Sequence, residues 1–261
     1  MSTTEQKRAI FINSTIEIAR NYGFDGVDLD WEFPSNNQEM FNLALLFREW
    51  RKALEIEART CGKPRLLLTA AVYYSSRFIN YGENRSYPIQ AINSYTDWIS
   101  PMCYDYHGSW ENFTGPNAAL FDPNGNFSTS YGLGSWIESG LSPKKVVMGL
   151  PLYGRTWKLK DPNMDWIGAP AIGMGPGEGV LTYSEILEFN NNNDKGKVYF
   201  DGETVSYYSV QGDYWVGYDD NMSVGRKVEY ARSLNLGGYF FWALGMDNNG
   251  ILIRQASDSG C

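Results

Sequence analysis

Short apolar segments alternate with longer amphipathic segments along most of the chain, and this alternation limits the possible folds more than any other feature. Apolar residues recur at helical spacing over 5–22 and again over 36–60. Residues 26–33 and 65–73 instead have the pattern of strands, and the second run is apolar throughout, as in strands buried on both faces of a parallel sheet. Alternating strands and helices predict a parallel α/β architecture.

The same order continues further along the chain, with one interruption. Three more strands are expected at 96–106, 144–153 and 237–244, and three more helices at 130–139, 222–235 and 250–257. Between Thr156 and Asp213 the order is lost, and residues rich in glycine, asparagine and short aromatic segments predict a small inserted α+β lobe. The asparagine run 190–193 is expected to be a loop within this lobe.

Charge and apolar content argue against several classes of function. The chain has 261 residues and a formal net charge of −8, which argues against nucleic acid as a partner because phosphate binding needs a basic face. No apolar run approaches the roughly 20 residues that a membrane span needs, so no membrane partner is expected. The first residues lack the apolar core of a signal peptide.

Few side chains suit a metal site or a disulfide framework. Cys61, Cys103 and Cys261 are too few for a disulfide scaffold and match no zinc spacing, and we expect no bridge among them. His107 is the only histidine, so a histidine-rich metal site is impossible and any Ser-His-Asp triad would need this residue. We expect neither a metal nor an organic cofactor.

Three carboxyl side chains share one face of the expected strand at 26–33. Residues at i, i+2 and i+4 of a strand point the same way, so Asp28, Asp30 and Glu32 form a row with about 6 to 7 Å between neighbours. Crowding and desolvation raise the pKa of at least one carboxyl in such a row, which keeps a proton available near neutral pH. Glu32 lies nearest the C-terminal end of the strand, where barrel active sites open, and we expect it to reach the substrate.

Two other interpretations of this row are a solvated acidic edge strand and a calcium site. Calcium loops place their ligands in glycine-punctuated turns. Here the acids lie along an apolar strand that ends at Pro34, which favours a catalytic row.

The segment at 25–34, DGVDLDWEFP, resembles the DGxDxDWExP motif of family 18 glycoside hydrolases, and the surrounding sequence resembles the plant class V chitinases most closely. Further motifs of the family follow in order: MCYD at 102–105, GLPLYGR at 149–155, WVGYDD at 215–220 and GGYFFW at 237–242. The resemblance covers essentially the whole chain. It implies a (β/α)8 TIM-type barrel with a small α+β insertion, and retaining hydrolysis of β-1,4-N-acetylglucosamine linkages in chitin or its oligosaccharides.

The resemblance also implies a role for each residue of the acid row. In this family the 2-acetamido oxygen of the substrate attacks the anomeric carbon, so no protein nucleophile is needed. Glu32 would protonate the leaving oxygen and later activate water. Asp30 would orient the acetamide and stabilise the oxazolinium ion, while Asp28 would share a proton with Asp30.

The other motifs contribute the expected contacts to the sugar. Tyr104 completes the expected catalytic set, and with Asp105 it would contact the acetamide and the distorted ring. Tyr153 would also contact the acetamide, and Trp242 would provide a stacking floor. Two more residues belong to the expected substrate-binding set, Met102 and Arg155.

Each of these partners also has a purely structural interpretation. Met102, Tyr104 and Trp242 are apolar or aromatic residues at strand positions and could be core. Arg155 could form an ion pair between the insertion and the barrel. The aspartates at 219–220 could only cap the helix that follows them.

The number of strands departs from the family pattern. A complete barrel has eight strands, whereas we count five here, near Val27, Leu67, Ile99, Val147 and Tyr239. The family places its acid row on the fourth strand, so the resemblance implies an N-terminally incomplete barrel without its first three strands. Such a barrel would have unpaired strand edges and apolar faces. The domains expected are 1–155, the barrel from its third helix to its seventh strand, 156–212, the α+β insertion, and 213–261, the C-terminal part of the barrel.

Other functions are compatible with the same sequence. The chain could be a lectin or receptor-type module that binds chitin oligosaccharides without turnover, an inactive truncated chitinase-like protein, or an inhibitor of another glycosidase. The resemblance implies an extracellular or vacuolar location. The sequence leaves endo versus exo action, lipid-modified substrates and the oligomeric state open.

Overall fold

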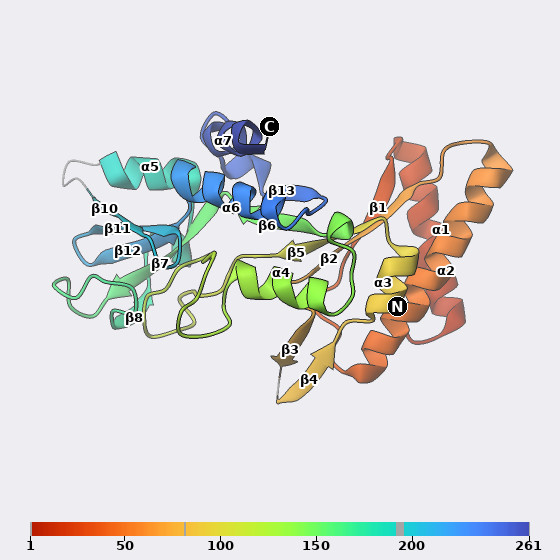
Figure 1. The fold of residues 1–261 in the computed structure, drawn as a ribbon, viewed down its shortest axis with the longest axis horizontal. Helices are drawn as coiled ribbons and strands as arrows, with labels where there is room; N and C mark the ends of the chain where they lie inside the picture. Colours follow the sequence, from red (N-terminus) through yellow and green to blue (C-terminus); the bar gives the residue numbers. More distant parts are fainter. Residues whose placement is uncertain (1, 81, 192–195, 261) are drawn as a thin grey trace. The chain divides into compact units, whose positions relative to one another are not determined.

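The computed structural model describes residues 2–80, 82–191 and 196–260 (Figure 1). By its internal contacts the chain divides into two compact units. The first consists of Met1–Pro101 and Leu133–Val147, and the second of Met102–Gly132 and Met148–Cys261. Among the described residues, no helix combines the length and the apolar character needed to cross a membrane.

Helices and strands alternate through the barrel-like parts of the sequence, as predicted. The helices are α1 (Glu5–Tyr22), α2 (Asn37–Cys61), α3 (Ile89–Tyr95), α4 (Thr129–Glu138), α5 (Tyr183–Asn191), α6 (Asn221–Ser233) and α7 (Ile251–Gly260), with 3₁₀ turns at Pro143–Lys145, Pro176–Gly179 and Leu244–Met246. The strands are β1 (Gly26–Asp30), β2 (Leu67–Tyr73), β3 (Arg77–Asn80), β4 (Glu83–Ser86), β5 (Trp98–Met102), β6 (Val147–Pro151), β7 (Tyr153–Leu159), β8 (Ala171–Met174), β9 (Val180–Thr182), β10 (Lys197–Asp201), β11 (Ser206–Gln211), β12 (Tyr214–Tyr218) and β13 (Gly238–Trp242).

In the first unit, a sheet of order β1-β2-β5 packs with the long helices α1 and α2 (Figure 1). Both helices end at a glycine, Gly23 and Gly62, whose positive φ of 72° and 68° suits the left-handed C-terminal cap. An isolated parallel bridge joins Ile99 of β5 to Val146. The buried side chains of α2 and of the strands form the core, among them Leu46, Phe47, Trp50, Leu54, Leu68 and Ile99.

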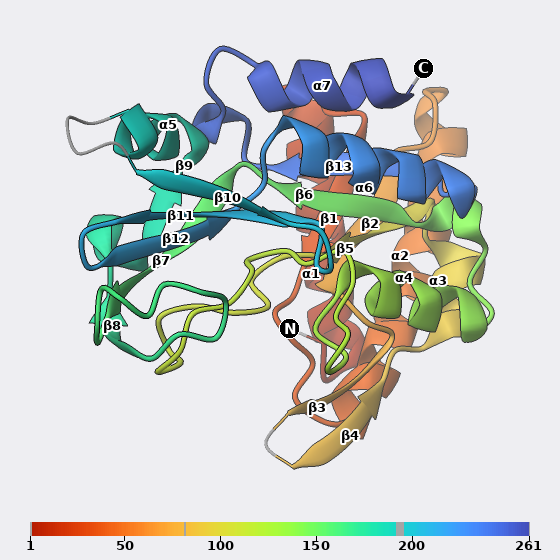
Figure 2. The same cartoon turned by 60° about the vertical axis from the view of Figure 1, so that its left-hand side comes forward.

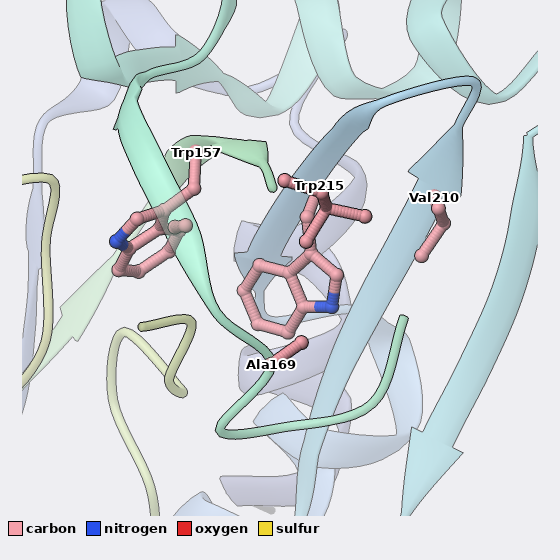
Figure 3. Close-up of a cluster of buried hydrophobic side chains, with 6 residues drawn as sticks. Trp157, Ala169, Val210 and Trp215 are labelled. Atoms are coloured by element: carbon pink, nitrogen blue, oxygen red, sulfur yellow. The ribbon is translucent and has the colours of Figure 1, made fainter. Parts of the chain in front are cut away.

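In the second unit, an antiparallel sheet of order β10-β11-β12-β7-β8 carries β9 as a further partner of β7. Its core is built around two tryptophans, Trp157 and Trp215, which are paired across β7 and β12 and have ring centroids 5.2 Å apart (Figure 3). Together with helix α5, this sheet provides the α+β character predicted for the insertion, while the domain boundaries stay a prediction.

The second unit also contains the pair β6–β13 and the helices α6 and α7, which lie side by side (Figure 2). Helix α6 begins with a capping box, in which Asp220 and Ser223 satisfy each other's backbone N–H groups. The predicted helix 222–235 is therefore confirmed, with its start one residue earlier.

Several predicted boundaries differ from the structure. The strand predicted at 26–33 ends at Asp30, and that predicted at 96–106 ends at Met102, so Cys103 follows the strand instead of lying inside it. The run 144–153 begins as a strand only at Val147 and passes at Leu152 into a second strand, β7. Helix α3 and the β3–β4 hairpin were not predicted from the sequence.

Candidate active site

The acid row lies on β1 and just beyond its end. β1 runs parallel to β2, with Asp28 opposite Thr69 in the register. All three acids are exposed, whereas Leu29, between the two aspartates, is buried. The two aspartates therefore lie on one face of the strand, as the alternation predicted. Glu32 follows Asp30 by two residues.

The surroundings of Asp28 change the protonation of its carboxyl. The residue as a whole is exposed, but its carboxyl is partly desolvated, which raises the pKa of Asp28, and the negative charge of Asp30 acts in the same direction. The Thr69 hydroxyl donates a hydrogen bond to Asp28 Oδ1, which opposes this rise but does not cancel it. The expectation that at least one carboxyl of the row has a raised pKa is confirmed for Asp28, with desolvation as the main cause.

Three aromatic residues of the first unit, Phe33, Tyr73 and Tyr87, contact one another. Tyr87 is buried, and its hydroxyl accepts a hydrogen bond from the backbone N–H of Tyr73 at 3.1 Å. Burial raises the pKa of Tyr87, and the negative charge of Glu32 adds to this effect. The ring of Phe33, next to Glu32, meets that of Tyr73 edge-on at 5.2 Å. The protonated Tyr87 phenol therefore lies within electrostatic reach of Glu32.

In the second unit, Asp105 accepts two hydrogen bonds on the same oxygen. The Tyr153 hydroxyl donates to Asp105 Oδ1 at 2.8 Å, and Arg155 Nε donates to it at 2.7 Å. The Arg155 guanidinium also lies 5.1 Å from the centre of the Trp110 ring, in the range of a cation–π contact. Arg155 therefore forms an ion pair, as one of its two interpretations expected, with a partner that follows β5 while Arg155 lies on β7; that this pair joins the insertion to the barrel stays a prediction.

Asn117 joins the backbones of these two residues. Its Oδ1 accepts the N–H of Asp105 at 3.1 Å, and its Nδ2 donates to the C=O of Tyr153, also at 3.1 Å. Asp105 has a φ of 59°, in the left-handed region that aspartate enters more readily than most side chains do. The amide therefore holds an unusual backbone conformation in place.

The predicted aromatic residues differ in exposure. Tyr104 is buried and packs against Tyr153 and Phe240, with Met102 partly buried against the same cluster. Trp242 is 52% exposed at the end of β13, so its interpretation as core is wrong. Burial, followed by the nearby Asp105 charge, raises the pKa of Tyr153, which keeps its hydroxyl protonated as a donor.

The aspartates at 219–220 have different structural roles. Asp220 caps helix α6, as predicted, and accepts a hydrogen bond from the Tyr183 hydroxyl at 2.7 Å. Asp219 does not cap the helix. It forms a buried ion pair with Lys227 at 2.5 Å, and both side chains are only 1% exposed.

The residues relevant to metal or thiol chemistry are isolated from one another. His107 Nδ1 lies 2.9 Å from Glu111, within its own loop. Cys61 is exposed and Cys103 is buried, and both are free thiols, while Cys261 lies outside the described residues. Within the described ranges, no three or more His, Cys, Asp or Glu side chains form a group that could hold a metal ion.

Three residues that contact the site residues or feel their charge were not found from the sequence. Thr69 had a usable signal, since it is a hydroxyl within the apolar run 66–72. Tyr87 and Asn117 had none, because their roles depend on contacts with residues distant in the sequence.

The comparisons with known proteins identify the class to which this fold and these motifs belong. The family model for glycosyl hydrolases family 18 matches residues 1–247, and the chain belongs to this family. Its solved neighbours give it a TIM-barrel-like α/β fold with an insertion.

Individual relatives are chitinases or resemble them. The chain is 56% identical over 262 residues to the class V chitinase CHIT5a of Medicago truncatula, covering 99% of this chain and 68% of that protein. It matches the GH18 chitinase of Cycas revoluta, solved in complex with (GlcNAc)3, with a TM-score of 0.95 and 46% identity over 99% of this chain and 74% of the other. The chitinase-like agglutinin RobpsCRA of Robinia pseudoacacia is 39% identical, with a TM-score of 0.90, over 100% of this chain and 75% of the other. The chain thus spans about two thirds of the length of its curated relatives.

Proposed function

We propose that this chain hydrolyses β-1,4-linked N-acetylglucosamine in chitin or chitin oligosaccharides, with retention of configuration and Glu32 as general acid and base. The observation that carries this function is the acid row on β1, with all three of its carboxyls present. Membership of family 18 and the close relatives named chitinases support it. The chitin oligosaccharide bound to the Cycas neighbour supports the substrate class.

The reaction proceeds in two steps. In the first, Glu32 gives its proton to the glycosidic oxygen, the bond from that oxygen to the anomeric carbon breaks, and the substrate's acetamide oxygen bonds to the same carbon. In the second, the Glu32 carboxylate takes a proton from water, whose oxygen attacks the anomeric carbon and reopens the oxazolinium ring. Two inversions at one carbon give net retention.

The two aspartates support the charged intermediate. Asp30 orients the acetamide and stabilises the positive charge of the oxazolinium ion. Asp28 holds the proton that the pair shares, a role supported by its raised pKa. When the substrate is absent, Asp28 and Asp30 share one proton. When positive charge develops on the substrate, the proton stays on Asp28, whose raised pKa favours the protonated form, and Asp30 carries the full negative charge.

For the second unit we propose direct contacts to the sugar. The Asp105 carboxylate and the Tyr153 hydroxyl, already joined at 2.8 Å, contact the acetamide and the distorted ring. Tyr104 lies in the same cluster, and the exposed Trp242 indole provides the stacking floor. Met102 shapes the cluster by packing, and Arg155 forms an ion pair with the Asp105 carboxylate.

We propose further that these residues supply the fourth to eighth strands of the barrel, because the family's acid row lies on the fourth. Within the described residues, β1 pairs with β2 alone. Helix α1 has large exposed apolar side chains, with Ile10 70% and Tyr22 77% exposed, as expected of a face that another barrel unit covers. Turnover by these residues alone would therefore depend on how much of the site these five strands complete.

A second candidate function is binding of chitin oligosaccharides without turnover. The similarity to the Robinia chitinase-like agglutinin over the whole chain favours it as the alternative. The presence of Glu32 favours the enzyme, because binding alone needs no general acid.

We also propose an extracellular or vacuolar location. Sequons for N-glycosylation support it and occur at Asn13, Asn84, Asn112, Asn126 and Asn221. Expression in plant cells followed by treatment with an endoglycosidase tests it, because a protein that passes through the secretory pathway loses mass on deglycosylation.

Cleavage of N-acetylglucosamine hexamer tests the proposed function. The parent chain should release shorter oligomers, and Glu32→Gln should slow this by about 10²- to 10⁴-fold, because the amide cannot donate the proton. Glu55→Gln, an exposed glutamate of α2, is the matched control and should retain the parent rate. A folded parent that binds the hexamer without cleaving it would favour the agglutinin-like alternative.

A further inference from the structure

Asn117 is a buried side chain of the second unit that none of the motifs includes. It is 1% exposed and lies in the loop between β5 and α4. Its two amide atoms contact the backbones of Asp105 and Tyr153, the two residues to which the proposed function assigns the acetamide. The following inference rests on that proposed function.

The two hydrogen bonds require opposite chemistry from one side chain. Oδ1 must accept the N–H of Asp105, and Nδ2 must donate to the C=O of Tyr153, each at 3.1 Å. A carboxylate supplies only acceptors and an aliphatic side chain supplies neither, so asparagine matches both needs at this length. Since the backbone of Asp105 has a φ of 59°, its N–H has a direction that an ordinary extended or helical residue would not give it.

The loop around Asn117 is itself firmly held. The backbone C=O of Asn117 accepts the N–H of Tyr106 at 3.0 Å. The next carbonyl, that of Ala118, accepts from the buried Lys227 ammonium, which is paired with Asp219. Asn117 therefore connects a rigid support to the two residues whose side chains meet at 2.8 Å.

We propose that Asn117 is a positioning residue that fixes Asp105 and Tyr153 in one arrangement for the substrate's acetamide. In a substrate-assisted reaction the acetamide is the nucleophile, so its orientation decides how often the reactive geometry is reached. Small misplacements of such groups lower the rate of the chemical step more than they weaken binding of the rest of the sugar chain. Asn117 acts through its neighbours and makes no contact with the sugar in this proposal.

Asn117→Ala tests this positioning role by kinetics. We expect kcat on N-acetylglucosamine hexamer to fall about 10- to 100-fold, with KM changed by no more than about threefold, because the contacts that hold the rest of the sugar chain remain. The matched control is Thr114→Val. Thr114 is equally buried three residues earlier, but its hydroxyl bonds to backbone groups of Trp166, Gly168 and Ala169 instead. It should retain the parent kcat.

Amide hydrogen exchange separates positioning from loosening of the whole loop. In Asn117→Ala the Asp105 N–H loses its acceptor, so its exchange should accelerate at least about tenfold when opening is local. The Tyr106 N–H should keep its protection, because its acceptor is the backbone C=O of residue 117. Equal acceleration at both amides would mean that the loop has loosened as a whole, and this would overturn the proposal.

Asn117→Asp keeps the shape and one of the two bonds, and it remains a test if the alanine variant does not fold. The new carboxylate still accepts from Asp105 N–H but cannot donate to the C=O of Tyr153. Protonation restores a donor, so the ratio of its kcat to the parent kcat should rise as the pH falls. A constant ratio at all pH values, or an unchanged kcat in either variant, would contradict the proposal. If the parent chain cleaves nothing, the proposed function fails, and the exchange at Asp105 and Tyr106 still decides whether Asn117 holds this backbone.

Discussion

At the scale of single residues, the proposed mechanism depends on how neighbouring groups shift the pKa of one carboxyl, that of Asp28. Asp28 lies on β1 opposite Thr69 and on the same face as Asp30, and its carboxyl has a raised pKa. Its main cause is burial, with the Asp30 charge adding to it and the Thr69 hydrogen bond opposing it. The sequence predicted that one of the acids would be perturbed but not which, because burial and the Thr69 contact depend on the register between β1 and β2.

A prediction at this scale concerns the pH dependence of stability. A carboxyl whose pKa is higher in the folded than in the unfolded protein stabilises the fold below its unfolded pKa, and that contribution is lost as the pH rises through the folded pKa. The asparagine of Asp28→Asn cannot ionise, so the melting temperature of this variant minus that of the parent should increase as the pH rises from 3 to 8. Thermal melts of both proteins across this range measure the difference, with Asp25→Asn, an exposed aspartate just before β1, as control.

A melting-temperature difference between Asp28→Asn and the parent that stays the same at every pH would contradict the assigned shift. The same substitution should lower the cleavage rate at neutral pH, because an amide has no proton to share with Asp30.

At the scale of elements, long periodic segments were predictable and short ones were not. Helices α1 and α2 have amphipathic patterns with glycine stops, and their predicted limits agree with the structure within one residue. Helix α3 has seven residues and no side-chain cap at Pro88, and the β3–β4 hairpin has strands of four residues. Their stability comes from packing instead, as in the ring contact between Phe78 and Tyr87. A local pattern carries no sign of such contacts.

A prediction at this scale concerns the buried pair that joins α6 to the end of β12. Lys227→Met leaves Asp219 buried without its partner, and we expect the free energy of unfolding to fall by about 3 to 5 kcal/mol. The double variant Asp219→Leu with Lys227→Met removes both charges and should recover much of this loss, although Ala118 still loses its donor. Urea denaturation of the parent, Lys227→Met, Asp219→Leu and the double variant measures the coupling. A double variant less stable than the sum of the single effects would contradict this interpretation.

At the scale of the whole molecule, the motifs identified the family better than they described the site. The acid row, the MCYD segment and the GLPLYGR segment each lie on a strand or at its end, so their order and spacing could be read directly. The left-handed backbone of Asp105 and the link through Asn117 could not, because both depend on contacts made only in the folded chain. The exposure of Trp242 could not be predicted from the strand pattern either, because that pattern does not distinguish it from the buried aromatic residues of other strands.

The configuration of the first sugar released tests the central claim most directly. Proton NMR during cleavage of N-acetylglucosamine hexamer follows the anomer formed before mutarotation. Retention through the acetamide predicts the β anomer first from the parent chain, and no product on the same timescale from Glu32→Gln. An α anomer formed first, or β product released by Glu32→Gln at the parent rate, would contradict the mechanism and the role of Glu32.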